Sequence, residues 1–175
     1  MFNVEQCDDL TLPSIEKPQE FDPIQAAEDI IANMPNRPSI SHDGGDLAYY
    51  TPAADEVHLP FTWDFESLEQ YYSTAFHELG HSTGHRSRLN RLELEAGLAP
   101  LGSPTYSREE LVAEFCAAFL CNESDIQNTI ENSTAYVQSW ASVLRKDRRL
   151  VVTAAGQGQK AADYILDHTE SERTT

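Results

Sequence analysis

Residues 67–91 read SLEQYYSTAFHELGHSTGHRSRLNR and hold the most informative pattern of the chain. Apolar side chains recur there at helical spacing, namely Leu68, Tyr71, Tyr72, Ala75, Phe76 and Leu79. At about 100° per residue, this stripe lies roughly opposite His77 and His81, which are one helical turn apart. The stretch therefore predicts a helix that buries its apolar side and presents two histidines to another part of the protein.

The centre of this stretch is the motif HELGH, residues 77–81. Two histidines four apart on a helix can bind one metal ion, and a glutamate directly after the first can hold the bound water and accept its proton. The motif predicts a zinc site with His77 and His81 as ligands and Glu78 as general base. A solvated helix face that carries two histidines by chance is the alternative, and the strong apolar stripe favours the metal site.

A third ligand is expected because catalytic zinc usually has three protein ligands and one open position. Ser107-Arg108-Glu109-Glu110 has the form of a capping box, which predicts a second helix from Ser107 to about Cys121. Glu110 and Glu114 share one face of it, beside small alanines that allow close helix packing. We favour Glu110 as the ligand and Glu114 as the group that accepts a histidine N–H, over the reverse assignment.

Other candidate ligands fit less well. HELGHSTGH approaches the pattern HExxHxxGxxH, but His85 comes two residues early and Ser87 stands at the required position. Cys116 and Cys121 are expected to be small buried hydrophobic side chains rather than ligands. The lone His42 and His58 are interpreted as surface residues.

Length and charge limit the function classes. At 175 residues the chain is expected to form a single domain, and it lacks a membrane-spanning run or a signal peptide, which predicts a cytoplasmic protein. The net charge of −17 argues against autonomous nucleic-acid binding, because phosphate backbones repel a polyanion. The cluster of Arg86, Arg88 and Arg91 is explained by favourable placement of cations at a helix C-terminus. Three cysteines without CxxC spacing favour reduced thiols.

The rest of the chain predicts further helices and one small β element. Asp22-Pro23 has the form of an N-cap followed by a first-turn proline, so a helix is expected to start there and stop before Pro35. The other expected segments are a lead-in at 1–21, strands at 47–51 and 56–60, a loop at 92–106, helices at about 133–146 and 149–167, and a frayed tail at 169–175. Together they predict an α+β domain.

Three stretches carry a resemblance to a known family: HELGHSTGHRSRLNR, EELVAEFCAAFL and GGDLAYYTPAADEVHLP. The chain resembles the metallopeptidase domain of ArdC-type antirestriction proteins and of the polyvalent proteins of plasmids and phages, from FNVEQ to KAADYIL. The resemblance implies a zincin-like fold and supports Glu110 as the glutamate ligand. It also implies an edge strand of the hairpin along the active-site cleft, where an extended peptide could add.

ArdC-type proteins carry an N-terminal single-stranded-DNA-binding domain, and FNVEQ resembles the junction just after it. We therefore expect no such domain in residues 1–175, and no nucleic-acid binding by this chain alone.

The leading hypothesis is a metallopeptidase with one Zn²⁺ that hydrolyses a peptide or protein substrate, with Glu78 as base. Tyr106 or His85 is a candidate donor to the oxyanion. The alternative is a metal-stabilised, non-catalytic module that binds a host protein and uses its acidic surface as a DNA mimic. A DNA-processing metalloenzyme ranks last, because nucleases more often use pairs of Mg²⁺ bound by carboxylates.

Overall fold

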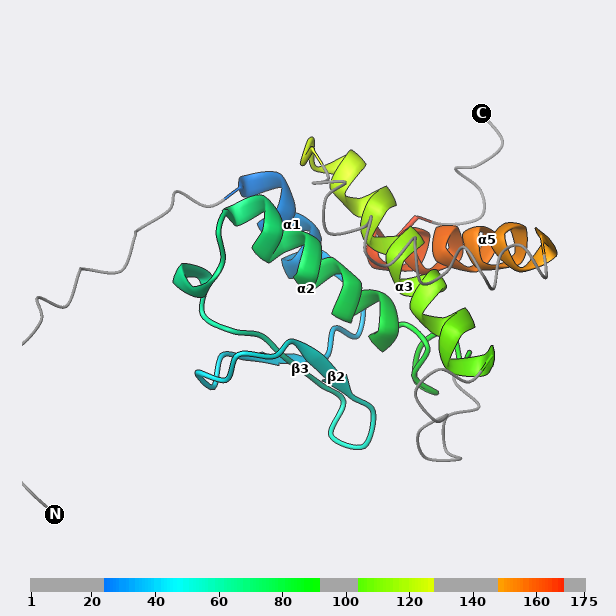
Figure 1. Cartoon of the computed structure of the whole chain (residues 1–175), viewed down its shortest axis with the longest axis horizontal. Coiled ribbons are helices and arrows are strands. Elements are labelled where there is room, and N and C mark those ends of the chain that lie inside the picture. The colour runs from blue at the N-terminus through cyan, green and yellow to red at the C-terminus, as the bar shows by residue number, and fades with distance from the viewer. Residues whose placement is uncertain (1–23, 92–103, 128–147, 169–175) are drawn as a thin grey trace, which may run out of the picture.

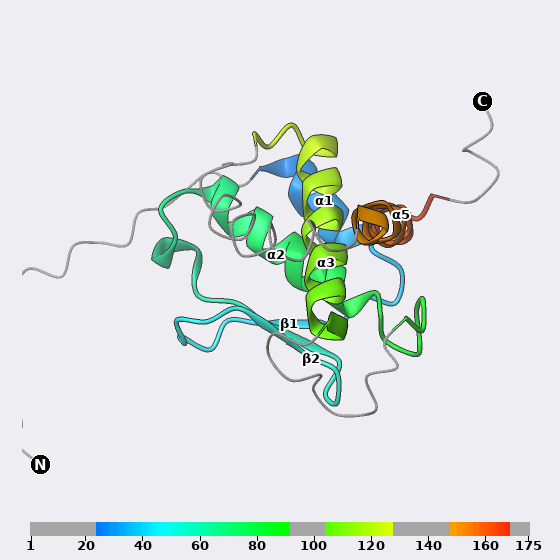
Figure 2. The same cartoon turned by 45° about the vertical axis from the view of Figure 1, so that its right-hand side comes forward.

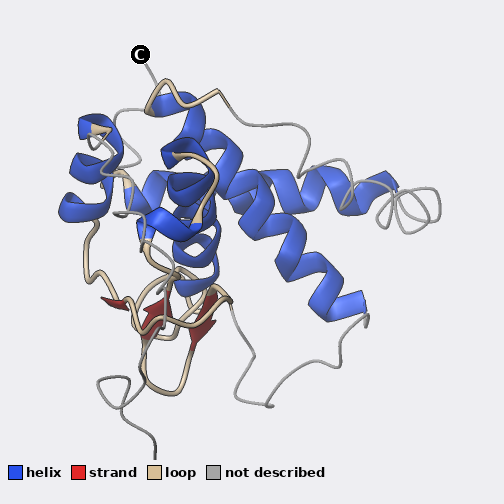
Figure 3. Ribbon diagram, turned by 60° about the vertical axis from the view of Figure 1, so that its left-hand side comes forward, coloured by secondary structure: helices blue, strands red, loops and turns tan. Residues whose placement is uncertain are grey.

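The computed structural model describes residues 24–91, 104–127 and 148–168, without the side chains of 104–107 and 148. A small sheet lies along one side of a group of helices, as Figures 1 and 3 show. In chain order the elements are α1 Gln25–Asn33, β1 Ser39–Ser41, β2 Tyr49–Thr51, β3 Glu56–His58, the 3-10 helix η2 Thr62–Asp64, α2 Leu68–Ser82, α3 Pro104–Glu123 and α5 Arg148–Ile165. This arrangement confirms the predicted α+β class. The lead-in, the tail and the helix predicted at 133–146 lie outside the described residues.

Helix α1 begins later than predicted. Its N-cap is Ile24, whose extended backbone has φ −79° and ψ 99° and whose side chain makes no capping hydrogen bond. The Ile24 carbonyl accepts from the amides of Ala27 and Glu28, so the helix starts after Ile24. Asp22 and Pro23 themselves lie outside the described residues. The helix ends at Asn33, as expected from Pro35.

The sheet has the strand order β1-β3-β2. The predicted hairpin is confirmed, since β2 and β3 pair antiparallel with Tyr50 opposite Val57. Strand β1 was not predicted and pairs parallel to β3. Its three residues, Ser-Ile-Ser, do alternate between polar and apolar, but the run is too short to distinguish a strand from a loop. Strand β2 is an edge strand of this sheet and contacts α2.

Helix α2 forms as predicted from its apolar stripe. Ser67 caps it by accepting a hydrogen bond from the Gln70 amide at 3.3 Å. The stripe is buried over Tyr71, Tyr72, Ala75, Phe76 and Leu79. These side chains form the centre of a core that also draws on α1, β3, α3 and α5. The histidine face is thereby turned away from the core.

The segment after α2 joins the helix to the hairpin through Arg88. Its guanidinium donates to the Ser82 carbonyl at 2.7 Å and to both carboxylate oxygens of Asp55 in the β2–β3 turn. The bond to Ser82 fits the prediction that these arginines favour the helix C-terminus. The pairing with Asp55 depends on the tertiary fold, and it leaves the Arg88 side chain with no exposed surface.

Helix α3 begins at Pro104, three residues before the predicted start. The capping-box interpretation is therefore wrong, because Ser107 is already helical and cannot be an N-cap. Residues 104–106, which were predicted to belong to the preceding loop, are therefore part of α3. Proline is favoured in a first helical turn, where its missing N–H leaves no hydrogen bond unmade.

Helix α5 confirms the helix predicted at about 149–167 and continues through two glycines. A Cβ at Gly158 would lie 2.5 Å from the Phe115 Cβ and 3.0 Å from the Val112 carbonyl oxygen. Only glycine therefore lets α5 approach α3 this closely. Figure 2 looks down α5 and shows α3 between α5 and α2. Within the described residues, no helix combines the length and apolar character that a membrane span requires.

Candidate metal centre

Three side chains from two helices converge on one point. His77 and His81 on α2 have their Nε2 atoms 3.1 Å apart. Glu110 on α3 places Oε2 3.6 Å from the His77 Nε2 and Oε1 3.5 Å from the His81 Nε2. The structure thus brings together the three residues that the sequence nominated as metal ligands, and they form a group able to hold an ion.

Small residues allow this convergence. A Cβ at Gly80 would lie 3.2 Å from both the Ala113 Cα and the Cys116 Cβ. Gly80 and Ala113 are both buried, so α2 and α3 pack with their backbones close together. The glycine of HELGH thereby helps to bring Glu110 within reach of the histidines. From the sequence, this close packing was predicted from the alanines of the second helix alone.

The outer nitrogen of each histidine faces a second carboxylate. The His77 Nδ1 lies 3.5 Å from Oε1 of Glu114, the residue proposed from sequence to orient a histidine. The His81 Nδ1 lies 3.6 Å from Oε1 of Glu109. The sequence named Glu109 only as a member of the expected capping box and gave it no role at the site. No periodic signal distinguishes it from its neighbour Glu110.

The donor set fits a divalent metal ion. When each histidine carries its proton on Nδ1, which faces a carboxylate, each Nε2 has a free lone pair. The two Nε2 atoms are then 3.1 Å apart with their lone pairs directed into the same space. Such an arrangement is repulsive without a cation between the rings. Bonds of about 2.0–2.1 Å to a tetrahedral ion place neighbouring ligand atoms roughly 3.3–3.4 Å apart. The observed separations of 3.1, 3.5 and 3.6 Å lie close to that value.

The electrostatic field of the site also favours a cation. Burial alone lowers the pKa of His77, but Glu110, Glu78 and Glu114 outweigh burial and raise that pKa above its ordinary value. Glu109 shows the opposite balance. Burial raises the pKa of the Glu109 carboxyl, but the interactions with His81 and Arg91 lower that pKa by more than burial raises it. The net pKa lies below its ordinary value, so Glu109 is a carboxylate.

Glu78 lies between the two histidines in sequence and is buried, with 8% of its surface exposed. Its carboxylate interacts electrostatically with His77. Among the described residues, none donates a hydrogen bond to it. A buried carboxylate needs a donor, so this group is suited to accept one from a water or a substrate at the site.

The other candidates are Tyr106, His85 and the cysteines. The backbone of Tyr106 is in the first turn of α3, and its side chain lies outside the described residues. His85 follows α2 and its Nδ1 lies 2.7 Å from the Ser87 hydroxyl. Cys116 and Cys121 are buried free thiols whose pKa is raised by burial, in agreement with the prediction that they are core side chains.

The two lone histidines of the sheet region also lie away from the site. His42 is exposed, with its Nε2 3.0 Å from the Tyr71 hydroxyl. His58 is half-buried beside Ser41 and Asp43.

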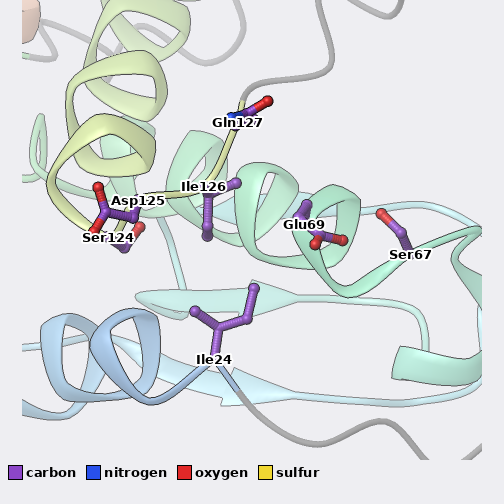
Figure 4. A pocket seen from close by; sticks show the side chains of 7 residues that line it. All are labelled: Ile24, Ser67, Glu69, Ser124, Asp125, Ile126 and Gln127. Atoms are coloured by element: carbon purple, nitrogen blue, oxygen red, sulfur yellow. The ribbon is translucent and has the colours of Figure 1, made fainter.

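Two hollows lie elsewhere on the described surface. One of about 310 Å³, shown in Figure 4, is formed where α1 and α2 begin and α3 ends, and its lining includes Ile24, Ser67 and Ile126. Another of about 490 Å³ is lined by residues 44–46 and by residues between Pro60 and Gln70. Neither is lined by the histidines or by Glu110. Convergent ligand atoms, rather than cavity volume, therefore locate the chemistry of this domain.

Known proteins share this architecture. Residues 25–157 match a family described as zincin-like metallopeptidase. A DNA primase TraC of Escherichia coli is 40% identical over 167 residues, which are 95% of this chain and 15% of that protein. The Mn(II)-bound crystal structure of the antirestriction protein ArdC from the R388 plasmid superposes with a TM-score of 0.66 at 35% identity, covering 82% of this chain and 51% of that one. For the metal-free structure of ArdC, the TM-score is 0.64 at 34% identity, with 95% and 58% covered.

These matches confirm the zincin-like fold and the predicted likeness to ArdC-type proteins. The Mn(II)-bound relative and the donor set together indicate a divalent-metal site. The chain spans from about one seventh to somewhat over half of the length of these matched proteins.

Proposed function

This chain belongs to the zincin-like metallopeptidase family, and on this premise we propose that it hydrolyses peptide bonds with one bound Zn²⁺. One observation carries the proposal. The Glu78 carboxylate is buried beside two converging histidines and receives no hydrogen bond from any described residue. A purely structural metal site has no use for such a group, whereas a hydrolytic site needs a base at this place.

The residues divide the work between holding the ion and moving a proton. His77, His81 and Glu110 would hold the metal, and three protein ligands leave a position open to water. When bound, the ion lowers the pKa of water to about 7 and polarises the scissile carbonyl. The Glu78 carboxylate accepts a proton from the water while the oxygen of that water attacks the carbonyl carbon. It then returns the proton to the amine nitrogen as the C–N bond breaks. Tyr106 remains our candidate donor to the oxyanion.

Substitution of the base tests this mechanism. In Glu78→Gln the amide keeps the shape but cannot accept the proton, so cleavage should fall by about 10²–10⁴-fold. Metal content should be unchanged, because Glu78 is not among the three converging ligands. Cleavage of unfolded casein by the zinc-loaded protein, with metal content measured on the same sample, is the test. Glu69→Gln, an exposed change on the same helix, is the control. Full activity in metal-loaded Glu78→Gln would rule out this mechanism.

A second candidate is a non-catalytic module that binds a host protein. It is favoured by the antirestriction role named for the solved relatives and by the −17 charge, which would mimic DNA. The Glu78→Gln protein separates the two. If wild-type and variant block a restriction enzyme equally and neither cleaves casein, the non-catalytic function is favoured. Loss of the block in the variant favours hydrolysis.

A further inference from the structure

We propose that Arg91 and Glu109 form a clamp that fixes the orientation of the His81 imidazole and so sets the affinity of the site for its divalent ion. Both are positioning residues that act through His81. The inference rests on the metal centre of the proposed function but does not require that the centre be catalytic.

The clamp is anchored on both helices that carry ligands. Arg91 donates from Nη2 to Oε1 of Glu109 at 2.7 Å and from Nε to Oε2 at 3.1 Å, a two-point pairing that fixes the plane of the carboxylate. The same guanidinium donates to the Gly80 carbonyl at 3.0 Å and to the Thr83 hydroxyl at 2.9 Å. Arg91 therefore ties the C-terminal end of α2 to α3. Only 11% of the Arg91 side chain and 16% of the Glu109 side chain are exposed.

The held carboxylate faces the outer nitrogen of His81. Oε1 of Glu109, the oxygen that Arg91 grips more closely, lies 3.6 Å from the His81 Nδ1. A shift of roughly half an ångström would make this a hydrogen bond. A fixed acceptor at this place keeps the proton on Nδ1 and leaves the Nε2 lone pair aimed at the ion.

His77 lacks such an anchor. Its outer nitrogen faces Glu114, which is 31% exposed and receives no hydrogen bond from a described residue. The two histidines therefore differ in how firmly they are held. The clamp makes His81 the more rigid of the two.

Two effects of Arg91 on metal binding have opposite signs. Its positive charge repels a cation, whereas its hold on Glu109 orients a ligand. We expect orientation to dominate, because the charge is already compensated by the paired carboxylate at 2.7 Å. If only the charge of Arg91 mattered, removing it would tighten binding of the ion. If its hold on Glu109 matters more, removing it weakens binding. The direction of the change distinguishes the two.

The test compares Arg91→Met, Arg91→Lys and Glu109→Gln with wild-type protein. Zn²⁺ affinity is measured by competition with a chromophoric chelator, and circular dichroism of the metal-free proteins reports folding. Each clamp variant should bind Zn²⁺ about 10–100-fold more weakly, the range seen when the orienting partner of a metal ligand is lost. Arg91→Lys should weaken binding too, because it keeps the charge but loses the two-point pairing. Exposed Glu69→Gln and Arg86→Met are matched controls that should bind like wild-type.

The visible spectrum of the Co²⁺-loaded protein gives a second measurement. The d–d bands should shift in the clamp variants, since the coordination of His81 changes, and should not shift in the controls. If Arg91→Met fails to fold, Arg91→Lys and Glu109→Gln decide the question. Folded clamp variants that bind Zn²⁺ as tightly as wild-type, or more tightly, would overturn the proposal.

The outcome is independent of catalysis. Weakened metal binding in the clamp variants of a protein that never cleaves casein would leave the clamp standing and reject the proposed function. Casein cleavage with unchanged affinity in all clamp variants would do the reverse.

Discussion

Arg88 shows how much a single side chain contributes to the placement of the hairpin. Its guanidinium is fully buried and also donates to the Asn36 carbonyl at 2.8 Å and the Tyr50 hydroxyl at 3.1 Å. Tyr50 in turn donates to Asp55 at 2.7 Å. A buried cation is tolerated only when its N–H groups are paired, and this network pairs them. It fixes edge strand β2 relative to the end of the histidine helix.

The pairing of Asp55 should appear in the pH dependence of stability. Burial alone raises the pKa of Asp55, but the hydrogen bonds from Arg88 and Tyr50 hold it below its ordinary value of 3.8. The folded-state pKa is depressed, so the stabilisation is present above pH 3.8 and is lost as the pH falls through the folded-state pKa. Asp55→Asn should lower the free energy of unfolding by about 1–2 kcal/mol at pH 7.

Urea unfolding between pH 2 and pH 7, in the presence of a chelator, measures the difference between wild-type and Asp55→Asn. Titration of other groups is common to both proteins and largely cancels. The gap should narrow as the pH falls below about 4. A gap of constant size over the whole range would show that the charge of Asp55 contributes nothing.

At the residue scale, the sequence predicted the converging group and one of its two outer carboxylates, Glu114, but missed the other, Glu109. His77, Glu78 and His81 follow from a spacing that is local to one helix. Glu110 required an argument about a second helix, and the structure brings it to the histidines. The role of these residues as ligands and base stays a prediction. Glu109 and Arg91 could not be foreseen, because their pairing depends on how the segment after α2 returns to α3.

Close contacts between helices depend on glycine, a residue that usually weakens a helix. The helix predicted at about 149–167 contains Gly156 and Gly158, and both are helical in α5. Gly158 is buried against α3, whereas a Cβ at Gly156 would meet nothing within 4 Å. Close packing therefore requires glycine at position 158, whereas position 156 has room for a side chain.

Alanine substitutions at the two positions should change stability in opposite directions. Gly158→Ala would place a Cβ 2.5 Å from the Phe115 Cβ and near the α3 backbone, so it should destabilise the fold by about 1–3 kcal/mol or more. Gly156→Ala, the matched control, should stabilise it by up to about 1 kcal/mol, because alanine favours a helix more than glycine. Thermal or urea unfolding measures both. Equal effects of the two substitutions would contradict the packing of α5 on α3.

Helices and strands could be predicted where apolar residues recur at regular spacing along the sequence. Helix α2 and the β2–β3 hairpin followed from apolar spacing, and α5 followed in spite of its glycines. Errors occurred at the starts of α1 and α3, where capping motifs pointed to Asp22 and Ser107. Such motifs describe a local preference, and the helix start is decided by the backbone that packing selects. Strand β1 was missed because it exists only through its pairing with β3.

At the scale of the whole molecule, α2 packs on the small sheet, α3 packs on α2, and α5 packs on α3. The apolar core joins all the described helices with β3, and the metal centre lies between α2 and α3 on the side away from the apolar stripe. The ArdC structures with and without Mn(II) match this chain almost equally well. Both forms of that relative therefore resemble the fold described here.

The central claim is that His77, His81 and Glu110 together hold one divalent ion. The most direct test is a crystal structure of the zinc-loaded protein, with anomalous diffraction recorded on both sides of the zinc absorption edge. We predict one anomalous peak bonded to the Nε2 atoms of both histidines and to the Glu110 carboxylate, at about 2.0–2.2 Å. A peak bonded to Glu114 or Glu109 in place of Glu110, or one that touches neither histidine, would contradict the claim.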